Sequence, residues 1–251
     1  MQHFINSHDL SLVSLSYLVS VLGAFVALYV ADYIADEKGS IRFGWLTLAS
    51  VVFGGCAIWA MHFTGMLAFK MDFAASYDVS ATLLSLALPV LLAGIGFYVA
   101  YKWQDSIAAW LSAGIVFGLG VAAMHYLGMQ ALRTEAMMHH DSILVAVSIG
   151  IAVVAATAAL RIVVHWRGML RLVSPFIMGL AVCGMHYTGM AAMEFMPAAE
   201  GVVEVDYFEG AWSPTFMGFA AGLAVFLTLL VGSALVMFRK ALDLEPEFAA
   251  S

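Results

Sequence analysis

Three copies of a six-residue motif carry the side chains that could bind a metal. The copies read MHFTGM from Met61 to Met66, MHYLGM from Met124 to Met129, and MHYTGM from Met185 to Met190. Imidazole nitrogen together with soft thioether sulfur suits copper, above all Cu(I), better than it suits Mg, Ca or Mn. The motif therefore predicts one or two copper ions held by His62, His125, His186, Met66, Met129, Met190, Met61, Met124 and Met185.

A helical motif would place each histidine beside the last methionine of its copy. His62 and Met66 are four residues apart, the spacing that shares one face of an α-helix. The first methionine lies about 100° round the helix and could reach a neighbouring helix. Gly65, Gly128 and Gly189 remove bulk next to this face and permit close helix approach. A glycine six residues before the first methionine, at Gly55, Gly118 and Gly179, extends the repeat beyond the motif.

The elements that position the motifs are expected to be membrane-spanning helices. Apolar residues make up 63% of the chain and charged residues 11%, whereas soluble domains have about half and a quarter. Open sheet edges cannot face lipid, and the apolar runs are too long for barrel strands. We predict an all-α polytopic membrane protein with about seven transmembrane helices, at residues 10–31, 45–67, 79–101, 109–131, 143–165, 172–193 and 214–238.

The motif copies are about 60 residues apart, which is the length of two spanning helices with their links. Three matched copies at this spacing indicate an internal repeat. We expect one membrane domain over residues 1–240, with two-helix units at 10–70, 79–133 and 143–195 and a seventh helix at 214–238. Residues 241–251 would form a tail or begin a linker. Three units of equal topology predict a pseudo-threefold bundle that brings the histidines together.

The distribution of lysine and arginine predicts the orientation of the chain. Positively charged short loops are retained in the cytoplasm. One side carries eight of the ten basic residues, and the other carries only Lys70 and Arg133. The N-terminus should therefore lie outside, the C-terminus in the cytoplasm and the motifs near the outer face. The loop after the sixth helix, also outside, is acidic, with Glu194, Glu200, Glu204, Asp206 and Glu209.

The three motifs, their places at the ends of alternate helices and the two-helix period resemble the MHYT domain family of bacterial membrane sensors, over nearly the whole chain. The resemblance implies a sensory domain of the bacterial cytoplasmic (inner) membrane that coordinates copper and perceives oxygen, carbon monoxide, nitric oxide or the copper redox state. It also implies a cytoplasmic output, such as a cyclic-di-GMP enzyme, a kinase or a regulator. The family's tyrosine falls on Tyr126 and Tyr187, and Phe63 replaces it in the first copy.

The sequence leaves two functions open besides that of a sensor. Histidines on different helices could hold a haem, or the chain could handle copper as a membrane redox or transport protein. A transporter favours broken helices and polar groups near the midplane, whereas here only Pro89 is expected in mid-helix. No nucleophile with a base and an orienting acid is visible, so we expect no enzyme, any output enzyme being absent from this chain.

The expected partners rest on composition and on the resemblance. Composition predicts a lipid bilayer as the surrounding, the resemblance implies a diatomic gas as a ligand, and the chain could act as a homodimer. The net charge is −7 and offers no basic surface for nucleic acid. The remaining histidines are expected to be loop or interface residues without a part in the metal site: His3, His8, His139, His140 and His165.

Overall fold

The computed structural model describes residues 7–70, 74–134, 136–197 and 209–249. Within these ranges it contains seven helices long and apolar enough to cross a membrane, which confirms the predicted all-α polytopic fold. Six of them are single helices, and the second span, Phe43–Ala68, consists of three consecutive segments. The single helices are α1 (Leu10–Ala31), α4 (Val79–Lys102), α5 (Ile107–Gln130), α6 (Ser142–His165), α7 (Gly168–Ala191) and α8 (Pro214–Ala249).

Two helix ends differ from the sequence-based expectation by four residues or more. The helix expected to stop at residue 238 continues as α8 to Ala249, through the segment expected to be a tail. Helix α7 begins at Gly168, four residues earlier than expected, so Pro175 lies inside a motif helix and Pro89 is not the only proline within a span. Of the acidic loop, Glu200, Glu204 and Asp206 lie outside the described residues, as does His3.

The second span contains a π-helix. It consists of α2 (Phe43–Ser50), the π-helix η1 (Val51–Ala60) and α3 (Met61–Ala68), which carries the first motif. A π-helix makes i to i+5 hydrogen bonds and so accommodates more residues per turn than an α-helix. The first motif helix is therefore wound differently from α5 and α7, which carry the other two motifs as regular α-helices.

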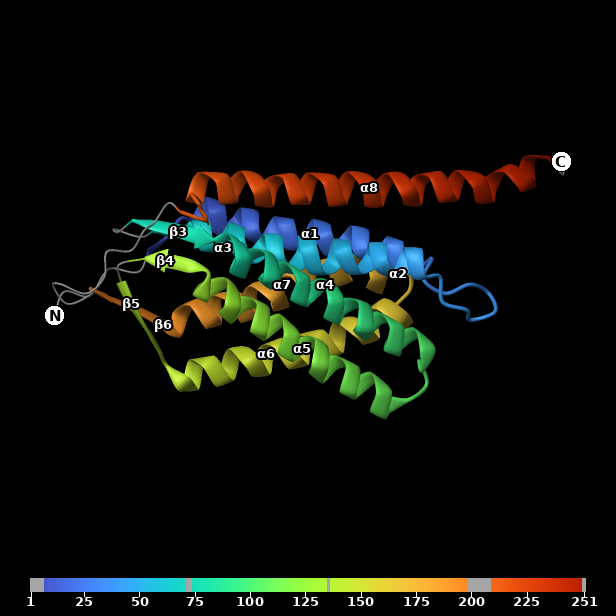
Figure 1. Cartoon of the computed structure of the whole chain (residues 1–251). Helices are drawn as coiled ribbons and strands as arrows, with labels where there is room; N and C mark the ends of the chain where they lie inside the picture. Colours follow the sequence, from blue (N-terminus) through green and yellow to red (C-terminus); the bar gives the residue numbers. More distant parts are fainter. Residues whose placement is uncertain (1–6, 71–73, 135, 198–208, 250–251) are drawn as a thin grey trace.

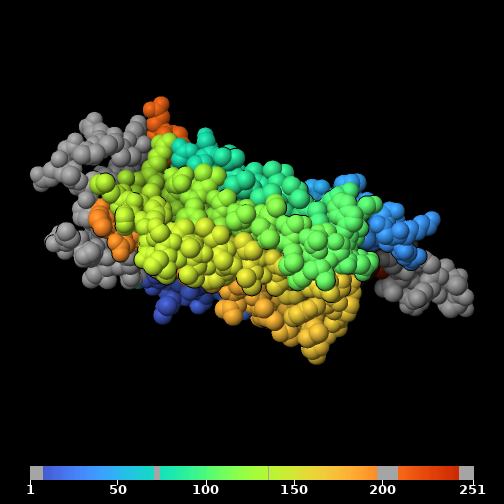
Figure 2. All heavy atoms as spheres, turned by 90° about the horizontal axis from the view of Figure 1, so that it is seen from below, coloured from blue at the N-terminus to red at the C-terminus, as the bar shows by residue number. Residues whose placement is uncertain are grey.

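Six spans form a closed ring, and α8 lies outside it. Going round, α1 packs on η1 and α3, η1 on α4, α4 on α5, α5 on α6, and α6 on α7. The ring closes because α7 packs back on α1. Motif helices thus alternate with α1, α4 and α6. Helix α8 runs along α1, η1 and α3 and extends beyond the others (Figure 1). Figure 2 shows another face, where α5, α6 and α7 lie next to one another in green, yellow and gold.

Short antiparallel ribbons gather at one end of the ring, which we call the ribbon end (Figure 1). Each ribbon pairs the segment before α1, α4 or α6 with the segment after the next motif helix. The pairs are β1 (Ser7–His8) with β2 (Phe69–Lys70), β3 (Ala75–Asp78) with β4 (Leu132–Thr134), and β5 (Ala136–His140) with β6 (Met193–Pro197), while β7 (Ala211–Trp212) adds to β3.

An aspartate begins each of α1, α4 and α6. Asp9, Asp78 and Asp141 accept hydrogen bonds from backbone N–H groups of the first turn. These bonds lower the pKa of Asp9 and Asp78, and Arg133 lowers that of Asp78 further. The same aspartates donate their own backbone N–H to the last turn of a motif helix, at 2.8, 2.7 and 2.9 Å to the carbonyls of Ala68, Ala131 and Ala192.

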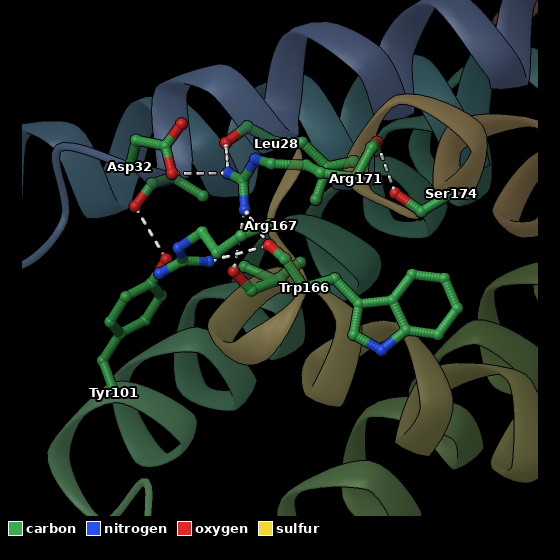
Figure 3. Close-up of polar contacts among 9 residues, drawn as sticks. Leu28, Asp32, Tyr101, Trp166, Arg167, Arg171 and Ser174 are labelled. Atoms are coloured by element: carbon green, nitrogen blue, oxygen red, sulfur yellow. Dashed lines mark hydrogen bonds and ion pairs between the residues drawn. The ribbon is translucent and has the colours of Figure 1, made fainter. Parts of the chain in front are cut away.

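We call the end of the ring opposite the ribbons the basic end. Polar contacts among α1, α4 and α7 hold it together (Figure 3). Arg171 of α7 donates to the Leu28 carbonyl and lies 2.6 Å from the Asp32 carboxylate, at the end of α1. Tyr101 of α4 donates to the Ala31 carbonyl at 2.7 Å. Burial raises the pKa of Asp32, and the charge of Arg171 opposes this shift. These contacts hold together the ends of α1, α4 and α7 that lie opposite the ribbons, and α7 carries the third motif at its other end.

Candidate metal centre

The three motif histidines meet in the middle of the ring. The Nδ1 atom of His62 lies 3.1 Å from Nδ1 of His186 and 3.1 Å from Nδ1 of His125. One nitrogen from each imidazole lies within 4.8 Å of those of the other two. The three side chains are at most 1% exposed. The pseudo-threefold arrangement expected from the repeat therefore brings these residues together.

Each imidazole lies over the glycine of another motif copy. A Cβ atom on Gly128 would lie 2.4 Å from Nε2 of His62. The corresponding distance is 2.3 Å from Gly189 to His125 and from Gly65 to His186. The motif glycine was expected to let helices approach, and the structure shows that the space it leaves receives an imidazole from the neighbouring helix.

The donor set and its spacing fit a metal ion. Among the residues that the structure describes, the three Nε2 atoms have no hydrogen-bond partner, although buried polar atoms normally have one. A neutral imidazole has one N–H and one lone pair, and which ring nitrogen carries the N–H depends on the tautomer. In the tautomer with the N–H on Nε2, the three Nδ1 lone pairs converge. Imidazole nitrogens bound tetrahedrally at about 2.0 Å lie roughly 3.3 Å apart, close to the spacing seen here. A cation would turn the repulsion among these lone pairs into ligation.

A haem does not fit this geometry. Axial ligands bind on opposite faces of a porphyrin, with two iron–nitrogen bonds between them. The Nδ1 atoms of His62 and its two partners are 3.1 Å apart, less than the sum of two such bonds. The ring centroids lie only 5.0 to 5.2 Å apart, edge to face. The arrangement suits a single ion or a close pair of ions and not a macrocycle.

A motif methionine stands on either side of each triad histidine in the sequence, and all six methionines are buried. Their exposed fraction is 3% or less in each case. Met185 lines an apolar cavity between the helices. The assignment of thioethers as metal ligands stays a prediction for Met61, Met66, Met124, Met129, Met185 and Met190.

The motif tyrosines fasten the ring. Tyr126 Oη lies 2.6 Å from Ser148 Oγ of α6, and Tyr187 Oη lies 2.8 Å from Ser16 Oγ of α1. The first copy has Phe63 in place of a tyrosine, and there Trp59 Nε1 donates to Ser85 Oγ of α4 at 3.1 Å. Each motif helix is thus hydrogen-bonded to a buried serine of the helix that follows it round the ring.

These serines were not among the predicted site residues, although the sequence contains a signal for them. Helices α1, α4 and α6 share an aspartate, a serine seven residues later and a valine five residues after that. The positions are Asp9, Ser16 and Val21, then Asp78, Ser85 and Val90, then Asp141, Ser148 and Val153. The scattered pattern supplies the N-caps, the hydrogen-bond partners of the motif helices and the close helix contacts.

Aromatic side chains cover the triad on the ribbon side. The residue before each capping aspartate packs on the motif residue that follows a histidine: His8 on Tyr187 at 5.7 Å between ring centroids, Tyr77 on Phe63 at 5.7 Å, and His140 on Tyr126 at 6.4 Å. Burial lowers the pKa of His8 and raises that of Tyr77. The structure places His139 on β5 and bonds His165 to Arg161, both outside the triad.

Comparison with known proteins identifies the repeat. The family described as "Bacterial signalling protein N terminal repeat", MHYT, matches residues 55–113, 118–174 and 179–245. Each match begins within a motif-bearing span and includes the helix after it. The predicted unit boundaries at 10–70, 79–133 and 143–195 stay a prediction. In the ring, α1 occupies the place between α7 and η1. No solved structure matches the chain.

Curated relatives are bacterial signalling proteins. The chain is 37% identical over 197 residues to the bifunctional diguanylate cyclase/cyclic di-GMP phosphodiesterase MucR of Pseudomonas aeruginosa, covering 76% of this chain and 29% of MucR. It is 35% identical to the cyclic di-GMP phosphodiesterase NbdA of the same species, covering 73% of this chain and 24% of NbdA. The chain thus spans less than a third of the length of these relatives. The chain belongs to the MHYT family of bacterial signalling proteins.

Proposed function

We propose that this chain is a copper-binding sensory domain of the bacterial cytoplasmic membrane, which reports a diatomic gas or the copper redox state to a cytoplasmic output. The observation that carries the proposal is the meeting of three buried imidazoles, in which Nδ1 of His62 lies 3.1 Å from Nδ1 of each of the other two and the Nε2 atoms have no hydrogen-bond partner among the described residues. An ionisable group inside a membrane span is costly and usually functional. Here three such groups converge on one point.

Three protein nitrogens leave room for a further ligand. A metal site with an open position can bind a small molecule, whereas a site filled by protein cannot. Bound copper would supply that open position, and the thioethers of Met66, Met129 and Met190 would gain importance as ligands on reduction to Cu(I). The imidazoles fix the ion, and the motif glycines fix the imidazoles. A change in the ligands or the redox state of the metal would therefore act on all three motif helices.

The output is proposed from the relatives and from α8. MucR and NbdA are named for cyclic-di-GMP turnover, and a cyclic-di-GMP enzyme is accordingly the proposed output, with a kinase or regulator as the alternatives. Helix α8 packs on η1 and α3, directly behind the first motif, and runs to the basic end. Lys240 of α8 also lies 5.1 Å over the ring of Tyr29 in α1. This helix can carry a movement of the first motif helix away from the metal.

The proposed orientation can be tested with reporter fusions. Positive loops are retained in the cytoplasm, so a reporter after Lys240 should show a cytoplasmic signal. A reporter inserted in the acidic loop before α8 should show an external signal. Fusions after Lys102, at the basic end, provide the matched control for an internal loop. A cytoplasmic signal from the acidic loop would overturn the orientation and place the motifs at the inner face.

Copper content tests the site. Protein purified without an affinity tag should contain one or two copper ions per chain, and the variant with His62, His125 and His186 all changed to alanine should contain almost none. Changes to alanine at His139, His140 or His165 should leave the copper content unaltered, because these residues lie outside the triad. Elemental analysis of matched preparations with equal folded fractions makes the measurement. Equal copper in the wild type and the triple variant would refute the proposal.

A further inference from the structure

An apolar cavity lies next to the triad, on the side of the basic end. Its volume is about 30 Å³. Met185, which immediately precedes a triad histidine in the chain, is one of its walls. Ile58, Val121 and Val182 also line it, and each of these residues stands four positions, one helical turn, before a triad histidine. The cavity therefore adjoins the layer of side chains that supports the three imidazoles.

The walls of the cavity define what it can hold. Every side chain that lines it is apolar, including Phe53, Phe117 and Met178 at the far end from the motifs. A water molecule needs about 10–15 Å³ and two to four polar partners, so this cavity has the space for a water but not the partners. Apolar cavities in proteins stay dry and take up small apolar molecules such as xenon. The size fits a molecule of one or two heavy atoms and excludes a lipid chain.

The cavity reaches the lipid-facing surface between α6 and α7. Its α6 wall is made of alanines, with Ala152, Ala156 and Ala159 buried. Ala155 of α6 and Ala181 of α7 also line it and are themselves partly exposed. The two helices lie side by side along the face in Figure 2. Ala155 and Ala181 thus lie both at the cavity and at the surface of the helix bundle.

We infer that this cavity is a docking site for a diatomic gas, which enters from the bilayer between Ala155 and Ala181. Apolar gases leave water for hydrocarbon by the same driving force that buries apolar side chains, so the bilayer is the richer source. The gas would dock one helical turn from the triad, beside Met185. The docking site is inferred from the cavity alone. The further step, in which the docked gas reaches the metal, rests on the proposed function.

Xenon tests the docking site without any metal. Wild-type protein in lipid nanodiscs, freed of metal, should give a saturable shift of the xenon-129 resonance. The Ala155→Leu variant should lose this shift, because the added carbons fill the cavity from its lipid side. Ala158→Leu is the matched control, since it makes the same change on the exposed face of α6 and should keep the shift. A wild type without a saturable shift, or Ala155→Leu with the full shift, would overturn the docking site.

A second variant and a second measurement complete the test. Ala181→Leu closes the same opening from α7 and should lose the xenon shift as well, which guards against a folding defect in one variant. The rate at which carbon monoxide binds the reduced, copper-loaded protein should fall about tenfold in both variants and stay unchanged in Ala158→Leu. An unchanged rate would overturn the supply route. Absence of copper would refute the proposed function and leave the xenon result standing.

Discussion

Replacement of Gly65 by alanine should abolish the proposed copper binding as completely as removal of a triad histidine. The new methyl group would lie 2.3 Å from Nε2 of His186, far inside van der Waals contact. The ring of His186 cannot yield without leaving the triad, because its Nδ1 lies 3.1 Å from Nδ1 of His62. Overpacking of this kind costs about 1–3 kcal/mol in a well-packed core. Copper per chain and the unfolding midpoint measure the two effects.

Gly184→Ala is the matched control. Gly184 also lies in a motif helix, and a methyl group there would meet open space among the described residues. An alanine in a helix interior is favoured over glycine by about 0.5–1 kcal/mol, so this variant should be at least as stable and retain its copper. Gly128→Ala and Gly189→Ala should repeat the loss seen at Gly65, since each faces an imidazole in the same way. Full copper in all three would mean that the imidazoles lie elsewhere.

Alanine at Gly54 should destabilise the fold strongly, whereas alanine at the adjacent Gly55 should be tolerated. A Cβ atom at Gly54 would lie 2.6 Å from backbone atoms of Pro89 and Val90, so η1 and α4 would have to separate. At Gly55 the nearest atom is Leu86 Cδ1, at an ordinary contact distance of 3.8 Å. We expect a loss of about 2–3 kcal/mol at Gly54, the upper part of the range for overpacked sites.

This pair of variants also tests the π-helix. Gly118 and Gly179 stand six positions before their motifs, whereas Gly54 stands seven positions before Met61. Gly118 faces Val153 of α6 and Gly179 faces Val21 of α1. Because η1 accommodates one extra residue, the equivalent contact with Val90 falls to Gly54. Thermal unfolding of both variants in one detergent measures the difference. A larger loss at Gly55 than at Gly54 would contradict the π-helical winding of this span.

The sequence predicted the spans and the meeting of the histidines because both depend on periodicity along the chain. Apolar runs of about 20 residues have the length that a helix needs to cross the bilayer, so they predict the spans directly. Motifs repeated at equal spacing occupy equivalent positions in a symmetric bundle, so the repeat predicts that His62, His125 and His186 lie together, as they do. These inferences need no knowledge of which helices touch.

The features that were missed depend on contacts between helices. Spacing to the motif indicated Gly55 as the counterpart of Gly118, but the winding of η1 moves that role to Gly54. The partner of the Tyr187 hydroxyl, Ser16, is 171 positions away. The ribbons are pairs of strands of two to five residues, too short for a pattern in the sequence to be read. Packing decides which neighbouring helix each side chain contacts. Composition and the spacing of apolar residues do not encode this packing.

Closure of the ring by α1 and α7 sets the order in which the protein can be completed during translation. The first helix leaves the ribosome long before its partner in the ring, and chain synthesis proceeds at about 5–20 residues per second. Until α7 is inserted, His62 and His125 border an unfilled gap, and the hydrogen bond of Ser16 with Tyr187 cannot form. The triad becomes whole only when His186 arrives on the last helix of the ring. A nascent chain stopped after α6 therefore contains two of the three triad histidines and lacks the third ligand of the proposed metal centre.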